Sequence, residues 1–290
     1  MRTTKFVLGM LLLLGVQAVV AQETQAPPKV LSVIREFLKP GKGGMAHQKT
    51  ESLFVEAFSH AKWPTHYLAV DSLSGKPRSL FLVGYDSFDA WEKDTNAARK
   101  NSALSAALDH ANEVDGELLS EVNMATFVYN EEYSYHSAVD IAHMRYFEIS
   151  LFHVRPGHQK EWDDLVKMVN AAYAKAMPDT HWAAYEAAYG QPGDTYVFFT
   201  PLKSMAEIDS EFMANKKFEA AMGEDGMKKL GELSAASIES SETNLFAFNP
   251  RISYVGDDWI KADPDFWKPK AAKASAGAEK KTGEKPAAKP

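Results

Sequence analysis

Two histidines, His66 and His181, have the residue type and the spacing best suited to chemistry. Each follows a threonine and precedes an aromatic residue, in THYLAVDSLSG (65–75) and THWAAYEAAYG (180–190). An imidazole titrates near neutral pH and can therefore act as a general base or hold a ligand by a hydrogen bond. A structural histidine that bonds a backbone carbonyl is the alternative. It is favoured here because both copies keep the residue.

The alternation of side chains along a strand gives each histidine a set of neighbours. His66 shares a face with Leu68 and Val70, whereas His181 shares a face with Ala183 and Tyr185. Positions at which two copies of a motif differ are better guides to a single pocket than the shared positions. Together with acidic residues in or at the ends of strands, these positions give five candidate ligand-binding residues: Tyr67, Glu148, Trp182, Tyr185 and Glu186.

Two glutamates, Glu36 and Glu148, interrupt the apolar strand sequences VLSVIREFL and YFEIS. A buried carboxylate costs several kcal/mol unless it is paired or protonated. We therefore expect both side chains at an exposed edge or at the rim of the sheet.

Several classes of site are excluded or unsupported by the sequence. The chain has 0 Cys, which excludes thiol chemistry and Cys-ligated metals. Its 9 His form no His-x-His, His-x3-His or HExxH pair, so no metal site is predicted. The net charge is -7, and the ends of the chain are basic, so residues 22–270 carry more negative charge than the whole. An acidic body argues against binding of nucleic acid.

The histidine motifs belong to a longer internal repeat. FLKPGK (37–42) matches HVRPGH (153–158), SGKPRSLFLV (74–83) matches YGQPGDTYVF (189–198), and YNEEYSY (129–135) matches FNPRISY (248–254). Hydrophobic periodicity predicts the order β-α-β-β-α-β in residues 29–136 and again in 143–255. Ser87 and Ser204 are predicted N-caps of the second helical region of each unit, and breaks are expected near Asn101 and near 223–226.

A first strand that ends in Lys/Arg-Pro-Gly and leads into an amphipathic helix, within this element order, resembles the dimeric α+β barrel superfamily. Antibiotic-biosynthesis-monooxygenase-like, NIPSNAP-like and EthD-like domains are members. The resemblance covers about residues 29–136 and 143–255. It implies an α+β fold in which two tandem ferredoxin-like units form a pseudo-dimeric barrel inside one chain, so that a monomer suffices. In this superfamily the barrel interior commonly holds a small apolar or aromatic ligand. Some members oxidise it with dioxygen and no cofactor, and others carry haem.

The two ends of the chain differ from these units. Arg2 and Lys5 precede an apolar run and the small residues around Ala21, which predicts a signal peptide over residues 1–21 and an exported, periplasmic or secreted protein. No later stretch is long and apolar enough for a membrane span. Residues 256–270 contain Trp259 and Trp267 and are expected to strap across the body or to cover an opening. Residues 271–290, rich in Lys, Ala and Pro, are expected to be disordered.

The sequence therefore predicts an exported protein that binds a small apolar or aromatic molecule inside a duplicated α+β barrel. The first alternative is a cofactor-independent monooxygenase or isomerase that uses His66 or His181 as its base. The second is a haem-binding protein. No cofactor is predicted, because no residue pattern supports haem, and whether the protein is an enzyme stays open.

Overall fold

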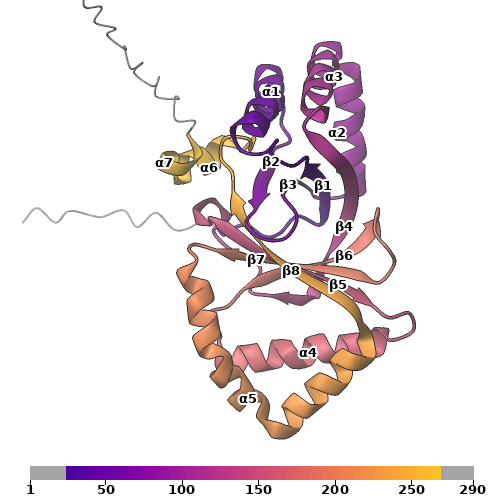
Figure 1. The fold of residues 1–290 in the computed structure, drawn as a ribbon, viewed down its shortest axis with the longest axis vertical. Helices are drawn as coiled ribbons and strands as arrows, with labels where there is room; N and C mark the ends of the chain where they lie inside the picture. Colours follow the sequence, from indigo (N-terminus) through magenta and orange to yellow (C-terminus); the bar gives the residue numbers. More distant parts are fainter. Residues whose placement is uncertain (1–23, 269–290) are drawn as a thin grey trace, which may run out of the picture.

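The computed structural model describes residues 24–268, which form a closed barrel of eight antiparallel strands with helices on its outside (Figure 1). Around the barrel the strands follow the order β1-β3-β2-β8-β5-β7-β6-β4. The strands are β1 (Val30–Leu38), β2 (Tyr67–Ser72), β3 (Arg78–Tyr85), β4 (Leu119–Tyr135), β5 (Tyr146–Val154), β6 (Trp182–Tyr189), β7 (Thr195–Leu202) and β8 (Ile238–Phe248). The helices are α1 (Met45–Ala61), α2 (Phe88–Lys100), α3 (Ser102–Gly116), η1 (Ile141–His143), α4 (Gln159–Ala176), α5 (Ala206–Ser237), α6 (Asp257–Ala262) and α7 (Pro264–Trp267).

Strand pairing confirms the mixed α+β fold and the barrel that the resemblance implies. The order β4-β1-β3-β2 in one half, and β8-β5-β7-β6 in the other, is that of a ferredoxin-like sheet. Pairing of β2 with β8 and of β4 with β6 joins the two halves and closes the barrel. Closure leaves no unpaired strand edge in the barrel wall. The architecture matches a ferredoxin-like pseudo-dimer.

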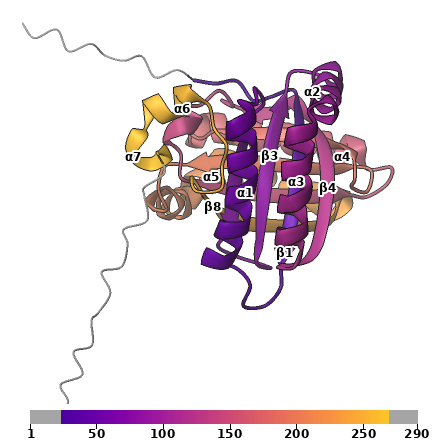
Figure 2. The same cartoon turned by 90° about the horizontal axis from the view of Figure 1, so that it is seen from above.

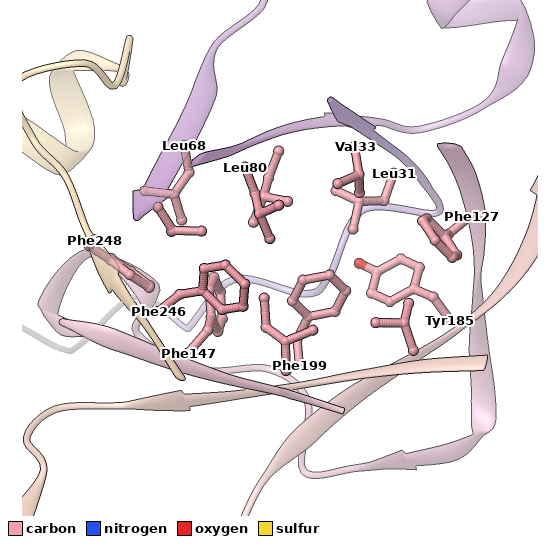
Figure 3. Packing of buried hydrophobic residues seen from close by; sticks show 14 of the residues in the cluster. Leu31, Val33, Leu68, Leu80, Phe127, Phe147, Tyr185, Phe199, Phe246 and Phe248 are labelled. Carbon is pink, nitrogen blue, oxygen red and sulfur yellow. The ribbon is translucent and has the colours of Figure 1, made fainter. Parts of the chain in front are cut away.

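The interior of the barrel is packed with aliphatic and aromatic side chains from alternate strand positions (Figure 3). Val70 and Phe246 are almost completely buried there, at 0% and 1% exposure. The opposite faces of the strands are covered by helices: α1 and α3 lie over the first half, and α4 and α5 over the second (Figures 1 and 2). The protein therefore has one apolar core inside the barrel and two others between the barrel wall and the helices, one in each half.

Local sequence signals account for several helix boundaries. Ser87 caps α2, since its hydroxyl accepts a hydrogen bond of 3.1 Å from the backbone N–H of Ala90. The predicted breaks are confirmed: Asn101 ends α2 and caps α3, and Gly223 interrupts α5 with a φ of 68°. The predicted cap at Ser204 is wrong. Helix α5 begins at Ala206 without a side-chain cap. The backbone N–H of Glu207, which a capping Ser204 hydroxyl would engage, donates instead to the Ser204 carbonyl at 3.2 Å.

The C-terminal residues of the structure lie against the barrel through α6 and α7. The Trp267 indole is 2% exposed and donates a hydrogen bond of 2.8 Å from Nε1 to the carbonyl of Ala142. Among the described residues, no helix combines the length and the apolar character needed to cross a bilayer. The predicted signal peptide (1–21) and the predicted basic tail (271–290) lie outside the described residues.

Candidate functional site: a pocket at one end of the barrel

A pocket of about 550 Å³ opens at one end of the barrel. Its depth is lined by apolar side chains of the inner core, from strands of both halves, and its rim is polar. The deep residues include Leu31, Leu68, Leu82, Phe147 and Phe199. An apolar cavity with a few polar groups at its mouth is typical of small-molecule sites.

The other end of the barrel is filled with charged and amide side chains. The guanidinium of Arg35 donates to the amide oxygen of Asn123, and Arg78 forms an ion pair of 3.2 Å with Glu242. Burial and the neighbouring Arg78 lower the pKa of Arg35. Only about 70 Å³ of space remains between these groups. A ligand of ordinary size therefore enters the interior only at the first end.

Tyr185 is the predicted ligand-binding residue whose side chain lies inside the barrel (Figure 3). Its ring packs edge-to-face against Tyr129 and Phe199, with ring centroids 5.6 and 5.7 Å apart. Its hydroxyl donates a hydrogen bond of 3.1 Å to the carbonyl of Pro28. Burial raises the pKa of Tyr185, so the hydroxyl keeps its proton and offers a neutral polar group to the pocket.

His66 lies at the rim of the pocket with an exposed side chain. Its ring packs on Tyr254 at a centroid distance of 4.8 Å. Gly256 lies beside it, and a Cβ on that glycine would meet the His66 ring at 3.5 Å and the Asp258 carboxylate at 2.3 Å. Within residues 24–268 the His66 nitrogens have no hydrogen-bond partner, so they are available to a ligand.

His181 also lines the pocket, but one of its nitrogens is already engaged. Nε2 lies 2.8 Å from the carbonyl oxygen of Pro201 and must carry the proton of this bond, since a carbonyl only accepts. This is the backbone hydrogen bond that the structural alternative predicts. The two predicted histidines are thus brought to one pocket with different roles: His181 ties β6 to β7, and His66 is free.

The rim is acidic. Asp86 and Asp258 line it, and the Asp258 carboxylate accepts a hydrogen bond of 3.4 Å from Gln25. Neither Lys nor Arg is found among the described residues that line the pocket. Two carboxylates without a basic partner disfavour an anion and favour a neutral or positively charged ligand.

The other predicted ligand-binding residues point away from the interior. Tyr67 and Trp182 border the pocket, but Tyr67 packs on Phe58 beneath α1, and Trp182 packs on Tyr173 of α4. Glu186 is exposed on the outer face of β6. Their placement gives them no direct access to the deep part of the pocket.

The two strand glutamates differ in their surroundings. Glu148 lies on the outer face of β5 and is half-buried, and this burial raises its pKa. Glu36 was expected to be exposed, and that expectation is wrong: its side chain is buried against His47 of α1, with 3.3 Å between His47 Nε2 and Glu36 Oε2. Helix α1 covers this face of β1, so the position is interior to the helix–sheet layer.

Sequence reasoning missed Gln25 and Asp258, which complete the rim together with Trp259 of the segment that was expected to strap across the body or cover an opening. These three residues lie outside the two repeat units. Hydrogen bonds from Trp259 Nε1 to Gln25 (3.2 Å) and from Gln25 to Asp258 (3.4 Å) join the two ends of the body here. The signal for Trp259 was its place in an aromatic segment after the second unit. Gln25 and Asp258 have no comparable signal.

The pocket residues fit haem poorly. Both His66 and Nδ1 of His181 offer a nitrogen lone pair for an axial ligand, since only Nε2 of His181 bonds Pro201, so the poor fit comes from the rim. The two propionates of haem would meet Asp86 and Asp258 with no Lys or Arg among the described lining residues. This arrangement repels the haem carboxylates.

No protein-family model matches the chain, and no curated protein matches it. Solved structures with a similar chain path include a candidate monooxygenase from Fusobacterium nucleatum (TM-score 0.49, 13% identity, 77% of this chain and 93% of that chain). An anthrone oxidase-like protein has a TM-score of 0.48 and 13% identity over 76% of this chain and 92% of that one. A mutant chlorite dismutase from Candidatus Nitrospira defluvii has a TM-score of 0.47 and 9% identity over 83% and 98%. These likenesses say nothing of substrate or activity here. The order and closure of its own strands give this single chain the fold of an α+β barrel with two ferredoxin-like halves.

Proposed function

We propose that the protein binds a small apolar or aromatic molecule in the pocket at the open end of the barrel. The observation that carries this proposal is the apolar cavity of about 550 Å³ beneath a polar rim. The ligand is neutral or positively charged, because Asp86 and Asp258 lie at the mouth. His66 is the group best placed to orient it, since its nitrogens have no partner within the described residues.

Export and duplication form part of the same proposal. The basic start and the apolar run before Ala21 support secretion or delivery to the periplasm. The collinear matches between residues 29–136 and 143–255, and the ferredoxin-like strand order of both halves, support a tandem duplication. One chain then supplies both halves of a barrel, and the protein works as a monomer with an internal pseudo-dimer.

Native mass spectrometry of the protein purified from its own source tests the ligand directly. We expect a bound small molecule, and we expect Ala183→Phe, which adds a ring to the wall of the pocket, to lower its occupancy at least about tenfold. Ala188→Phe on the exposed part of the same strand is the matched control. Binding that survives in Ala183→Phe, with the fold intact by circular dichroism, would refute a ligand in this pocket.

A second candidate function is cofactor-independent oxidation or isomerisation of the bound molecule, with His66 as the base. The observation that favours it is the free imidazole beside an apolar cavity, in which a proton of the ligand could be abstracted. Once a substrate is known, His66→Gln should lower kcat at least about a hundredfold. His181→Gln should change stability more than kcat. Equal activity of His66→Gln and the unaltered protein would refute His66 as the base.

A further inference from the structure

Four buried polar side chains meet outside the barrel, in the layer between the sheet and its helices. Glu36 comes from β1, His47 and Glu51 from successive turns of α1, and Asp115 from the last turn of α3. Helices α1 and α3 run side by side over this half of the sheet (Figure 2). None of the four residues is more than 9% exposed. We call them the buried quartet.

The donor atoms of the buried quartet have the spacing of a metal coordination shell. All four lie within 4.8 Å of one another. His47 Nε2 is 3.3 Å from Glu36 Oε2 and 3.7 Å from both Glu51 Oε1 and Asp115 Oδ1. Ligands at about 2.1 Å from a tetrahedral ion are about 3.4 Å from each other. The three distances from His47 Nε2 are close to this value, and side-chain movement within the 4.8 Å cluster would bring the carboxylate oxygens to it.

The carboxylates of the buried quartet face one imidazole, that of His47, and the hydroxyl of Thr50, which donates a hydrogen bond to Asp115 Oδ1. No Lys or Arg among the described residues forms an ion pair with these carboxylates. Even a protonated His47 would balance only one of three acids. Burial of an unpaired carboxylate costs several kcal/mol, so the quartet needs protons or a cation.

Three polar atoms that belong to the quartet or lie beside it have no hydrogen-bond partner. They are Glu51 Oε1, Asp115 Oδ2 and the hydroxyl oxygen of Tyr67 from β2. The Tyr67 side chain is about nine-tenths buried, and its pKa is raised by burial and by the nearby Glu51 and Glu36. Buried polar groups are rarely left unsatisfied in native proteins, and each one here needs an explanation. A bound ion supplies it for the carboxylates.

The second half of the chain fills the equivalent space with hydrophobic residues. When the two repeats are aligned on 37–42 and 153–158, Glu36 corresponds to Phe152. Aligned on the histidine motifs, His47 corresponds to Trp162 and Glu51 to Val166. These three residues pack together with Leu233, and the rings of Phe152 and Trp162 lie 5.2 Å apart. The fold thus needs no polar group at these positions, and the quartet serves another purpose.

We propose that Glu36, His47, Glu51 and Asp115 bind one divalent first-row transition-metal ion. One imidazole and three carboxylates suit Zn²⁺ or Mn²⁺ and are too hard for Cu⁺. Three ionised carboxylates also favour a doubly charged ion over a singly charged one. The sequence pattern predicts no metal site, because the ligands come from three elements; the only local signal is His47 and Glu51 four residues apart on α1.

The site is tested by titration of the chelator-treated full chain with Zn²⁺ and, separately, with Mn²⁺. We expect one ion per chain, and we expect Glu51→Gln to raise the Kd at least about tenfold for the preferred ion. Glu56→Gln, which removes an exposed carboxylate from the same helix, is the matched control and should keep the Kd of the unaltered protein. Thermal unfolding in the presence of the ion should show the same ranking.

Glu51→Gln should fold, because glutamine has nearly the same shape and the metal-free protein disfavours the charge at this position. Asp115→Asn provides a second test, and circular dichroism checks both folds. Loss of binding in both variants and its retention in Glu56→Gln support the site. No binding by the unaltered protein, or equal binding by all variants, would overturn it and leave the quartet as a proton-sharing network. The result is independent of the barrel pocket, to which none of the four residues contributes.

Discussion

Replacement of Trp267 by alanine should both destabilise the protein and open its pocket. The indole is buried against Phe248, Trp259 and Phe266, with ring centroids 6.4, 5.1 and 4.8 Å away. A tryptophan buries up to about 250 Å², which at about 25 cal/mol per Å² corresponds to about 6 kcal/mol. That area refers to an extended unfolded chain and is an upper bound, so the expected loss is about 3–5 kcal/mol.

Trp267→Phe separates packing from hydrogen bonding. Phenylalanine keeps most of the apolar contact but removes the indole hydrogen bond to the Ala142 carbonyl, which still accepts a bond of 3.3 Å from Arg145 Nη1, and we expect a loss of about 1 kcal/mol. Phe212→Ala is the surface control, since Phe212 is 72% exposed, and it should change stability by less than about 0.5 kcal/mol.

The assay is urea unfolding followed by circular dichroism, with ligand binding measured on the same variants. Helix α6 carries Asp258 and Trp259 to the rim and is held by the packing of Trp259 on Trp267. We therefore expect Trp267→Ala to weaken binding more than Trp267→Phe. If Trp267→Ala were as stable as Phe212→Ala, the segment 256–267 would contribute nothing to the folded state, and its role as a wall of the pocket would be refuted.

Three further predictions concern the barrel and its helices. Gly190→Ala should lower the free energy of unfolding in urea by several kcal/mol, because φ is +76° and the new Cβ would lie 2.2 Å from a carbonyl oxygen of β4. Gly193→Ala is the control and should be neutral or nearly so, because the space around Gly193 is open. Ser87→Ala should cost about 1 kcal/mol through loss of the α2 cap, and Ser87→Asp should restore it. Burial and the nearby Glu148 raise the pKa of Glu211, so the folded protein binds the carboxyl proton of Glu211 more tightly than the unfolded chain does. The stability of the fold therefore falls as the pH rises above the pKa that Glu211 has in the unfolded chain. Glu211→Gln should therefore raise Tm at neutral pH by a small amount, with no gain below pH 4; a loss of stability at pH 7 would contradict this.

The fold could be predicted because its signals are local and repeated. The Pro-Gly ends of β1 and β5, the strand alternation around His66 and His181, and the cap at Ser87 each reflect short-range physics. Two copies of the pattern strengthen each of them. The wrong prediction of a cap at Ser204 shows the limit of this reasoning. The backbone carbonyl and the side-chain hydroxyl of Ser204 compete for the same N–H donor, and the sequence does not say which one accepts.

The site was less predictable because it depends on which face of each strand is turned inward. Alternation separates Tyr185 from Trp182, but it does not say which of the two faces the interior. Only the placement of α1 and α4 decides this, and it puts Tyr185 inside and both Tyr67 and Trp182 outside. The burial of Glu36 has the same cause.

The places where the two halves differ are the places that carry the proposed functions. Inside the barrel, Val70 of β2 corresponds to Tyr185 of β6, so at this pair of positions only the second half has a hydroxyl. Beneath the helices the asymmetry is reversed, since only the first half has the buried quartet, and the second has the packing of Phe152 with Trp162. Shared positions keep the barrel closed because both halves must pair their strands in the same way. Strand pairing does not require a buried hydroxyl or carboxylate where the other half has a hydrocarbon side chain. The Tyr185 hydroxyl and the carboxylates of the buried quartet therefore each point to a ligand.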